Sequence, residues 1–120
     1  MSDSVYMNIL IVDDNRQMRE LIGEAVKHKC EQIYECSDGR EAFALYSKFR
    51  PDWVLMDWQM PDTDGLTATR EIIAEYPAAN ICLVTNFDDD FLRLEALEAG
   101  AKCFVLKRNL SELPIALTES

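Results

Sequence analysis

Long apolar runs, basic residues and paired cysteines are scarce or missing in this sequence. No apolar run approaches the roughly 18 residues that a membrane span needs, so we expect no transmembrane helix. The amino-terminal stretch Met-Ser-Asp-Ser-Val-Tyr-Met has no basic region followed by an apolar one, so it does not resemble a secretion signal. Lys and Arg number 12 against 22 Asp and Glu, a net charge of −10. Because nucleic-acid backbones are held by Lys and Arg, we expect no direct nucleic-acid partner. The acidic net charge suits a cytoplasmic protein, which is the location that we expect.

The four cysteines do not have the spacing of a metal or redox site. No two of them form a C-x-x-C pair, and the only histidine in the chain is His28. We therefore expect small, buried or half-buried apolar residues in a reducing compartment. The four are Cys30, Cys36, Cys82 and Cys103.

Short apolar runs alternate with amphipathic segments along the chain. Residues 8–13 form an apolar run that ends in acid, which is typical of a strand buried on both faces. Residues 18–26 follow with apolar side chains at i, i+3, i+4 and i+7, which is one face of a helix. The other expected strands are 32–36, 52–57, 80–85 and 102–107. The other expected helices begin at Asp38, Asp64, the acids 88–90 and Ser111, and the first three of these end before Pro51, Pro77 and Gly100.

Strand–helix pairs thus repeat five times, with no linker, internal repeat or low-complexity tract between them. This order predicts an α/β fold with a parallel sheet, right-handed crossovers and helices on both faces. The 120 residues are enough for one domain, so we expect a single domain over 1–120 and no output domain in this chain. In such sheets a site lies beyond the carboxyl ends of the strands.

Polar residues end four of the five expected strands. Asp13 and Asp14 end the first, Asp57 the third, Thr85 the fourth and Lys107 the fifth. A single Asp there is ordinarily a helix cap, a single Thr suits a strand, and a single Lys is ordinarily solvated. Because parallel strands share a direction, all five side chains should meet at one edge, which favours a functional site.

The charge at this edge favours a metal and a phosphoryl group. Two carboxylates about 4 Å apart repel by roughly 4 kcal/mol at an effective dielectric constant near 20. One lysine cannot neutralise three acids, so we expect a hard divalent cation, Mg²⁺ or Mn²⁺. Asp57 is the expected nucleophile, which would form an acyl phosphate. Thr85 and Lys107 would then supply a hydrogen-bond donor and a positive charge.

Four motifs in order resemble those of the receiver domain of two-component response regulators. They are Ile-Val-Asp-Asp at 11–14, Val-Leu-Met-Asp-Trp-Gln-Met-Pro-Asp-Thr-Asp-Gly at 54–65, Leu-Val-Thr at 83–85 and Gly-Ala-Lys-Cys-Phe-Val-Leu-Lys at 100–107. The resemblance covers essentially the whole chain. With Phe-Asp-Asp-Asp two residues after Thr85, the sequence is most similar to receivers of the class that often carry helix-turn-helix output domains.

This resemblance implies a flavodoxin-like (βα)₅ fold with strand order 2-1-3-4-5. It implies a phosphorylation-dependent signalling regulator, not a turnover enzyme. Asp57 would receive phosphate from a sensor histidine kinase or a phosphotransfer protein. Phosphorylation would remodel the face of the fourth helix, fifth strand and fifth helix, which would act on a downstream protein, an output domain or a second copy of the chain.

The resemblance also assigns roles to single residues near the strand ends. Asp14 and Asp57 would bind Mg²⁺ directly, with the backbone carbonyl of Gln59 as a third ligand, and Asp13 would act largely through bound water. Lys107 would contact the phosphoryl group.

Three further residues have roles in switching and in phosphoryl lifetime. Thr85 would contact the phosphoryl group and move toward it, and Phe104 would swing inward behind it. Gln59 and Phe87 would tune the lifetime, and an apolar Phe87 should hinder attacking water. Departures from the family pattern are Phe104 in place of Tyr, a bulky Trp58, a short last helix, and Arg108 in place of Pro. A cis peptide without Pro costs about 3 kcal/mol, so the cis bond common after this Lys is not expected.

Three other interpretations compete with the switch. A receiver-like module could bind partners without phosphorylation. A phosphatase or mutase with an aspartyl nucleophile commonly needs a second acid two residues later, where this chain has Gln59. A flavodoxin would need a hydroxyl-rich phosphate loop, where this chain has the acidic segment that begins at Asp13.

Overall fold

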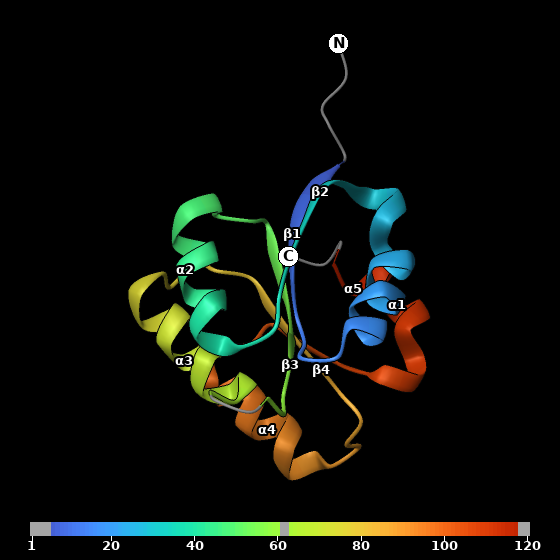
Figure 1. Cartoon of the computed structure of the whole chain (residues 1–120). Coiled ribbons are helices and arrows are strands. Elements are labelled where there is room, and N and C mark those ends of the chain that lie inside the picture. Colours follow the sequence, from blue (N-terminus) through green and yellow to red (C-terminus); the bar gives the residue numbers. More distant parts are fainter. Residues whose placement is uncertain (1–5, 61–62, 118–120) are drawn as a thin grey trace.

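Strands and helices alternate along the chain in a computed structural model, which describes residues 6–60 and 63–117 (Figure 1). The strands are β1 (Met7–Val12), β2 (Cys30–Cys36), β3 (Trp53–Asp57), β4 (Ile81–Thr85) and β5 (Cys103–Leu106). The α-helices are α1 (Arg16–Val26), α2 (Gly39–Phe49), α3 (Gly65–Glu75), α4 (Asp90–Ala99) and α5 (Leu113–Ala116), with 3₁₀ turns at Lys27–Lys29 and Lys107–Glu112.

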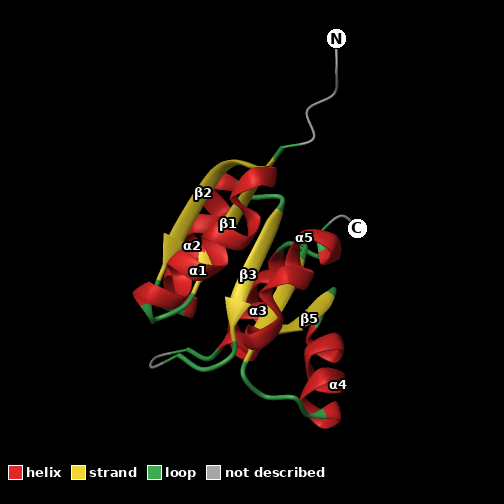
Figure 2. Ribbon diagram, turned by 90° about the vertical axis from the view of Figure 1, so that its right-hand side faces the viewer, coloured by secondary structure: helices red, strands yellow, loops and turns green. Residues whose placement is uncertain are grey.

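The five strands form one parallel sheet, as their alternation with helices predicts, in the order β2-β1-β3-β4-β5 that the family resemblance implies. Helices α2, α3 and α4 cover one face, and α1 and α5 cover the other (Figures 1 and 2). Successive strand residues point to opposite faces, so each strand contributes to two cores. In β1, Leu10 and Val12 face α2–α4, while Ile9 and Ile11 face α1 and α5.

Acidic and amide side chains begin four of the helices. Asn15, Asp38, Asp64 and Asp89 each accept a backbone N–H hydrogen bond from the first turn of α1, α2, α3 and α4. Glu41 completes the pair with Asp38 by accepting from the N–H of Ser37 at 3.4 Å. At the other end of α4, Gly100 has φ +107° and closes the helix in the left-handed region, as expected for a glycine cap.

The segment after β5 differs from the prediction. Ser111 was expected to cap the last helix, but it lies inside the 3₁₀ turn Lys107–Glu112, and Glu112 precedes α5 without a side-chain cap. The chain turns into this 3₁₀ segment directly from the strand, so the α-helix begins one residue later than a cap at Ser111 predicts. It is short, as expected, and Pro114 lies in its first turn.

Several smaller predictions are also answered. No peptide bond among the described residues is cis, including that between Lys107 and Arg108. All four cysteines are free; Cys36 and Cys82 are buried and the other two are half-buried. In the described part of the chain no helix has the length and apolarity to cross a bilayer. Pro61, within the motif at 54–65, lies outside the described residues.

Candidate functional site

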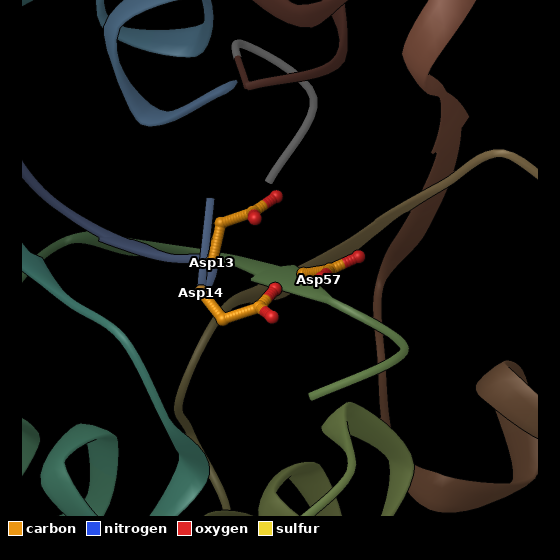
Figure 3. Close-up of side chains that lie close together, drawn as sticks. All are labelled: Asp13, Asp14 and Asp57. Atoms are coloured by element: carbon orange, nitrogen blue, oxygen red, sulfur yellow. The ribbon is translucent and has the colours of Figure 1, made fainter. Parts of the chain in front are cut away.

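The polar residues at the strand ends meet at the carboxyl edge of the sheet. Asp13, Asp57 and Thr85 are buried, whereas Asp14 is exposed. Figure 3 shows the side chains of the three acids projecting to the same side from the ends of β1 and β3. They line a cavity of about 390 Å³ together with every other residue that the sequence assigned to the site except Phe104. The full lining is Asp13, Asp14, Asn15, Asp57, Gln59, Met60, Thr85, Asn86, Phe87 and Lys107.

Lys107 lies between two of the acids. Its Nζ is 3.1 Å from Oδ2 of Asp13 and 3.0 Å from Oδ1 of Asp57, and only 10% of its side chain is exposed. Burial lowers the pKa of Lys107, but its hydrogen bonds to Asp57 and Asp13, together with the negative charges of these two carboxylates, outweigh this and leave the pKa raised. Lys107 therefore remains protonated at neutral pH and serves as the counter-ion of both carboxylates.

Asp57 is in a less favourable environment for a charge. Burial raises the pKa of its carboxyl group most; the hydrogen bond from Lys107 opposes this, and the negative charges of Asp13 and Asp14 add to it. The site is thus under-neutralised, with three carboxylates against one ammonium group.

The three acids have the geometry of a cation site. One carboxylate oxygen from each of Asp13, Asp14 and Asp57 can be chosen so that all lie within 4.8 Å of one another, and the described residues contain no other such group. Oδ2 of Asp13 is fully buried and, apart from its ion pair with Lys107, has no hydrogen bond. An oxygen-only donor set with excess negative charge suits a hard ion such as Mg²⁺ or Mn²⁺.

Thr85, at the end of β4, lines the cavity together with Asn86 and Phe87. Oγ1 of Thr85 accepts a hydrogen bond from the N–H of Phe87 at 3.2 Å, so its own hydroxyl proton can be donated to a ligand. Phe87 is 43% exposed, and with Gln59 it lines the cavity. Both residues assigned to lifetime tuning therefore lie beside the acceptor.

Phe104 lies on β5 and does not line the cavity. Its ring is buried and packs edge-on against Trp58, with 6.4 Å between ring centroids. The guanidinium of Arg93, on α4, lies 4.5 Å from the centre of the same ring. Sequence reasoning missed Arg93, because which face of α4 points at β5 depends on packing that no motif reveals.

Gly65, the first residue of α3, lies against the backbone of Asp57, a contact that sequence reasoning also missed. Its N–H donates to the carbonyl of Trp58 at 2.7 Å. A Cβ at this position would lie 2.9 Å from the carbonyl carbon of Asp57 and closer still to the carbonyl oxygen. The signal in the sequence is a glycine directly after the helix cap Asp64.

Comparison with known proteins identifies the family of this chain. Residues 9–118 match the family model of the response regulator receiver domain. The chain belongs to this family. Receiver domains of response regulators are signalling proteins and are generally not turnover enzymes, in line with the sequence prediction.

Two curated relatives show how much of a response regulator this receiver represents. The transcriptional regulatory protein YhcZ of Bacillus subtilis is 36% identical over 103 residues, which cover 84% of this chain and 48% of YhcZ. The receiver thus spans about half the length of YhcZ. The chemotaxis protein CheY of Listeria monocytogenes is 35% identical over 102 residues, which cover 84% of this chain and 86% of CheY.

Solved structures confirm the flavodoxin-like receiver fold. A LuxR-family response regulator from Aurantimonas superposes with a TM-score of 0.88 at 33% identity, covering 94% of this chain and 83% of that one. CheY in a CheX–CheY–BeF₃–Mg²⁺ complex from Borrelia burgdorferi superposes with a TM-score of 0.86 at 25% identity, covering 92% and 86%. The LuxR-family match agrees with the receiver class that the sequence resembles.

Proposed function

We propose that this receiver is a phosphoryl-accepting switch whose acceptor is Asp57. The observation that carries the proposal is the convergence of three carboxylates, one ammonium group and one hydroxyl on a single cavity. The phosphoryl donor would be the phosphohistidine of a sensor histidine kinase or phosphotransfer protein. The phosphoryl group of the donor and the carboxylate of Asp57 are both anionic, so the transfer needs positive charge close to them.

The transfer step moves one phosphoryl group between two protein side chains. A carboxylate oxygen of Asp57 attacks phosphorus, and a P–O bond forms as the P–N bond to the donor histidine breaks. The electron pair of the broken bond stays on the ring nitrogen that carried phosphorus, and the proton on the other ring nitrogen lets the histidine leave as neutral imidazole. Asp57 becomes a mixed anhydride of a carboxylic and a phosphoric acid.

Mg²⁺ or Mn²⁺ fits the three acids and, when bound, would offset the charge of the incoming phosphoryl oxygens. Asp14 and Asp57 are the direct side-chain ligands in this proposal, Gln59 contributes its backbone carbonyl, and Asp13 acts through water. The Borrelia CheY complex, which contains Mg²⁺ and BeF₃, supports the assignment by likeness.

Lys107 and Thr85 bind the transferred group. Lys107 already lies 3.0 Å from the acceptor, so it can follow the charge from the carboxylate to the phosphoryl oxygens with little movement. Thr85 can donate its hydroxyl proton, and its movement toward the phosphoryl group would leave room for Phe104 to move inward. The face of α4, β5 and α5 would then change and act on a downstream protein or output domain.

The lifetime of the phosphorylated state depends on access of water to phosphorus. Phe87 lines the cavity with an apolar ring where a polar side chain would help to orient water. We expect the phosphoryl group to persist for minutes or longer, and its loss within a few seconds would contradict this role for Phe87.

The direct test is chemical phosphorylation followed by intact-mass measurement. The protein is incubated with Mg²⁺ and acetyl phosphate or phosphoramidate, and we expect a gain of one phosphoryl group. Asp57→Asn should show no gain. Asp52→Asn, the same change at the other end of β3, should be phosphorylated normally. No gain with any donor would favour the phosphorylation-independent binding module.

A further inference from the structure

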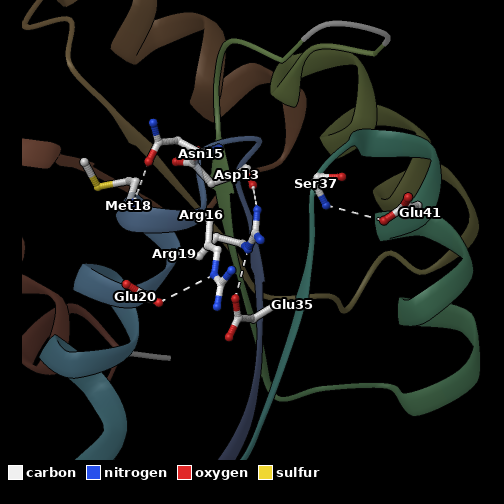
Figure 4. Close-up of polar contacts among 9 residues, drawn as sticks. All are labelled: Asp13, Asn15, Arg16, Met18, Arg19, Glu20, Glu35, Ser37 and Glu41. Carbon is white, nitrogen blue, oxygen red and sulfur yellow. Dashed lines mark hydrogen bonds and ion pairs between the residues drawn. The ribbon is translucent and has the colours of Figure 1, made fainter.

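Arg19 connects the acidic loop to two neighbouring elements. From the second turn of α1, its Nη1 donates to the backbone carbonyl of Asp13 at 2.7 Å, and its Nε donates to Oε1 of Glu35 on β2 at 2.9 Å. Figure 4 shows the guanidinium between these two acceptors. Only 18% of the Arg19 side chain is exposed, compared with 82% for Arg16 on the same helix.

Each polar group of Asp13 has a hydrogen-bond or ion-pair partner, and Arg19 is the partner of the backbone carbonyl next to Asp14. The N–H of Asp13 donates to the carbonyl of Cys36 at 3.1 Å, and Oδ1 accepts from the N–H of Asn15 at 2.8 Å. Oδ2 pairs with Lys107. The remaining group is the carbonyl, and its partner is Arg19.

This carbonyl belongs to the peptide unit that joins Asp13 to Asp14. A peptide unit is planar, so fixing the direction of its carbonyl also fixes the N–H and the Cα of the next residue. Asp14 is exposed, so burial does little to orient it. The direction in which its side chain leaves the backbone therefore depends on a peptide plane that Arg19 holds.

We infer that Arg19 is a positioning residue for the cation site: it orients the Asp13–Asp14 peptide so that the Asp14 carboxylate meets that of Asp57. The inference rests on the proposed function, because it assigns the two acids to a divalent cation. Glu35 has the lesser part of holding the guanidinium in place from the outer side.

The direction in which Mg²⁺ affinity changes when Arg19 is replaced distinguishes a positioning role from a purely electrostatic one. Arg19 is itself a cation near the site, so its removal should tighten Mg²⁺ binding if its charge were all that mattered. Loss of positioning acts in the opposite direction and should weaken binding. Residues that orient metal ligands typically change metal affinity by about 10–100-fold when they are replaced.

The test is a Mg²⁺ titration of the whole chain, followed by tryptophan fluorescence because Trp58 directly follows Asp57, and by thermal shift. We expect Arg19→Ala to raise the Kd for Mg²⁺ by about tenfold or more. Arg16→Ala is the matched control, since it removes the same charge from an exposed position of the same helix, and its Kd should equal that of the wild type. Glu35→Ala should give a smaller rise, because the bond to Asp13 remains.

Arg19→Lys keeps the charge but replaces the planar guanidinium, which reaches the two acceptors through separate nitrogens, with a single shorter-reaching ammonium group. It serves if Arg19→Ala does not fold. It should also weaken Mg²⁺ binding, while urea unfolding in EDTA stays close to that of the wild type. If Mg²⁺ binds Arg19→Ala or Arg19→Lys as tightly as the wild type, the inference is wrong and the proposed function stands. If the wild type itself does not respond to Mg²⁺, both are wrong.

Discussion

Lys107 is the residue on which the charge of the site depends. Its ammonium group is shared between Asp13 and Asp57, and it is the only cation among the residues that line the cavity. Without a divalent ion it is the counter-ion of the acids, and in the phosphorylated protein it would have to serve the phosphoryl oxygens as well. A cation bound by the three acids would release Lys107 from part of its present pairing.

Gly65 should be indispensable for a different reason, which is space. In Gly65→Ala the new Cβ would collide with the backbone carbonyl of Asp57, so either the protein or the acceptor must shift. We expect a loss of about 1–3 kcal/mol in the free energy of unfolding, measured by urea denaturation, and a lower phosphorylation rate.

Gly23→Ala is the control for this substitution. A Cβ at Gly23, in α1, would lie 3.9 Å from Cδ1 of Ile11, an ordinary contact. The alanine should stabilise the helix by up to about 1 kcal/mol. If Gly65→Ala were as stable as Gly23→Ala, the α3 backbone could not lie so close to the carbonyl of Asp57.

The cysteines should differ in reactivity because only the thiolate reacts. Burial, with a smaller contribution from the charge of Glu41, raises the pKa of Cys36 to about 12. Burial also raises the pKa of Cys30, whereas a hydrogen bond from the thiol of Cys82 lowers that of half-buried Cys103. With iodoacetamide at mildly alkaline pH, peptide mapping should find Cys103 alkylated first and Cys36 protected. Alkylation of Cys36 first would contradict these environments.

The helix caps belong to the scale of the element, and they were predictable. Asp38, Asp64 and the acids at 88–90 each mark the start of a helix in the sequence, because a carboxylate can accept the free N–H groups of the first turn. The carboxyl ends of the strands could be predicted equally well, and with them the meeting of Asp13, Asp57, Thr85 and Lys107 at one edge of the sheet.

Contacts between elements were not predictable in the same way. Arg19 binds a backbone carbonyl, which leaves no pattern in the sequence, and Arg93 reaches Phe104 only because of how α4 is rotated against β5. Ser111 misled because a Ser before an apolar stretch suggests a cap wherever the chain can begin an α-helix. Here a 3₁₀ turn occupies that position.

Asp89 should carry most of the capping of α4. Its Oδ1 accepts from the N–H groups of Phe91 at 2.8 Å and Leu92 at 3.4 Å. Asp89→Ala should lower the free energy of unfolding by about 1 kcal/mol, whereas Asp89→Asn keeps an acceptor and should lose less. Urea denaturation of the two variants measures this, and equal losses would show that charge, not the hydrogen bond, is what Asp89 contributes.

At the scale of the whole molecule, cation binding should change stability. A ligand that binds only the folded state adds about 2.7 kcal/mol to the free energy of unfolding at 100 times its Kd. Mg²⁺ should therefore raise the Tm of the wild type, and Asp14→Ala should abolish the rise.

Without a divalent cation, Asp14→Ala should affect stability in the opposite direction. In EDTA, Asp14→Ala should be at least as stable as the wild type, because one of three mutually repelling carboxylates is gone. Asp90→Ala, which removes an acid that does not line the cavity, should keep the Mg²⁺ response. An equal rise of Tm in Asp14→Ala and the wild type would show that the ion binds elsewhere.

The central claim is that one carboxylate of this acidic protein, Asp57, receives the phosphoryl group. The most direct measurement is to phosphorylate the wild-type protein with acetyl phosphate and Mg²⁺, reduce the acyl phosphate with borohydride, and locate the product by peptide mass spectrometry. Reduction converts a phosphorylated Asp to homoserine, so we expect homoserine at position 57 and unmodified Asp at positions 13 and 14. Homoserine at either of those positions, or at none, would contradict the account.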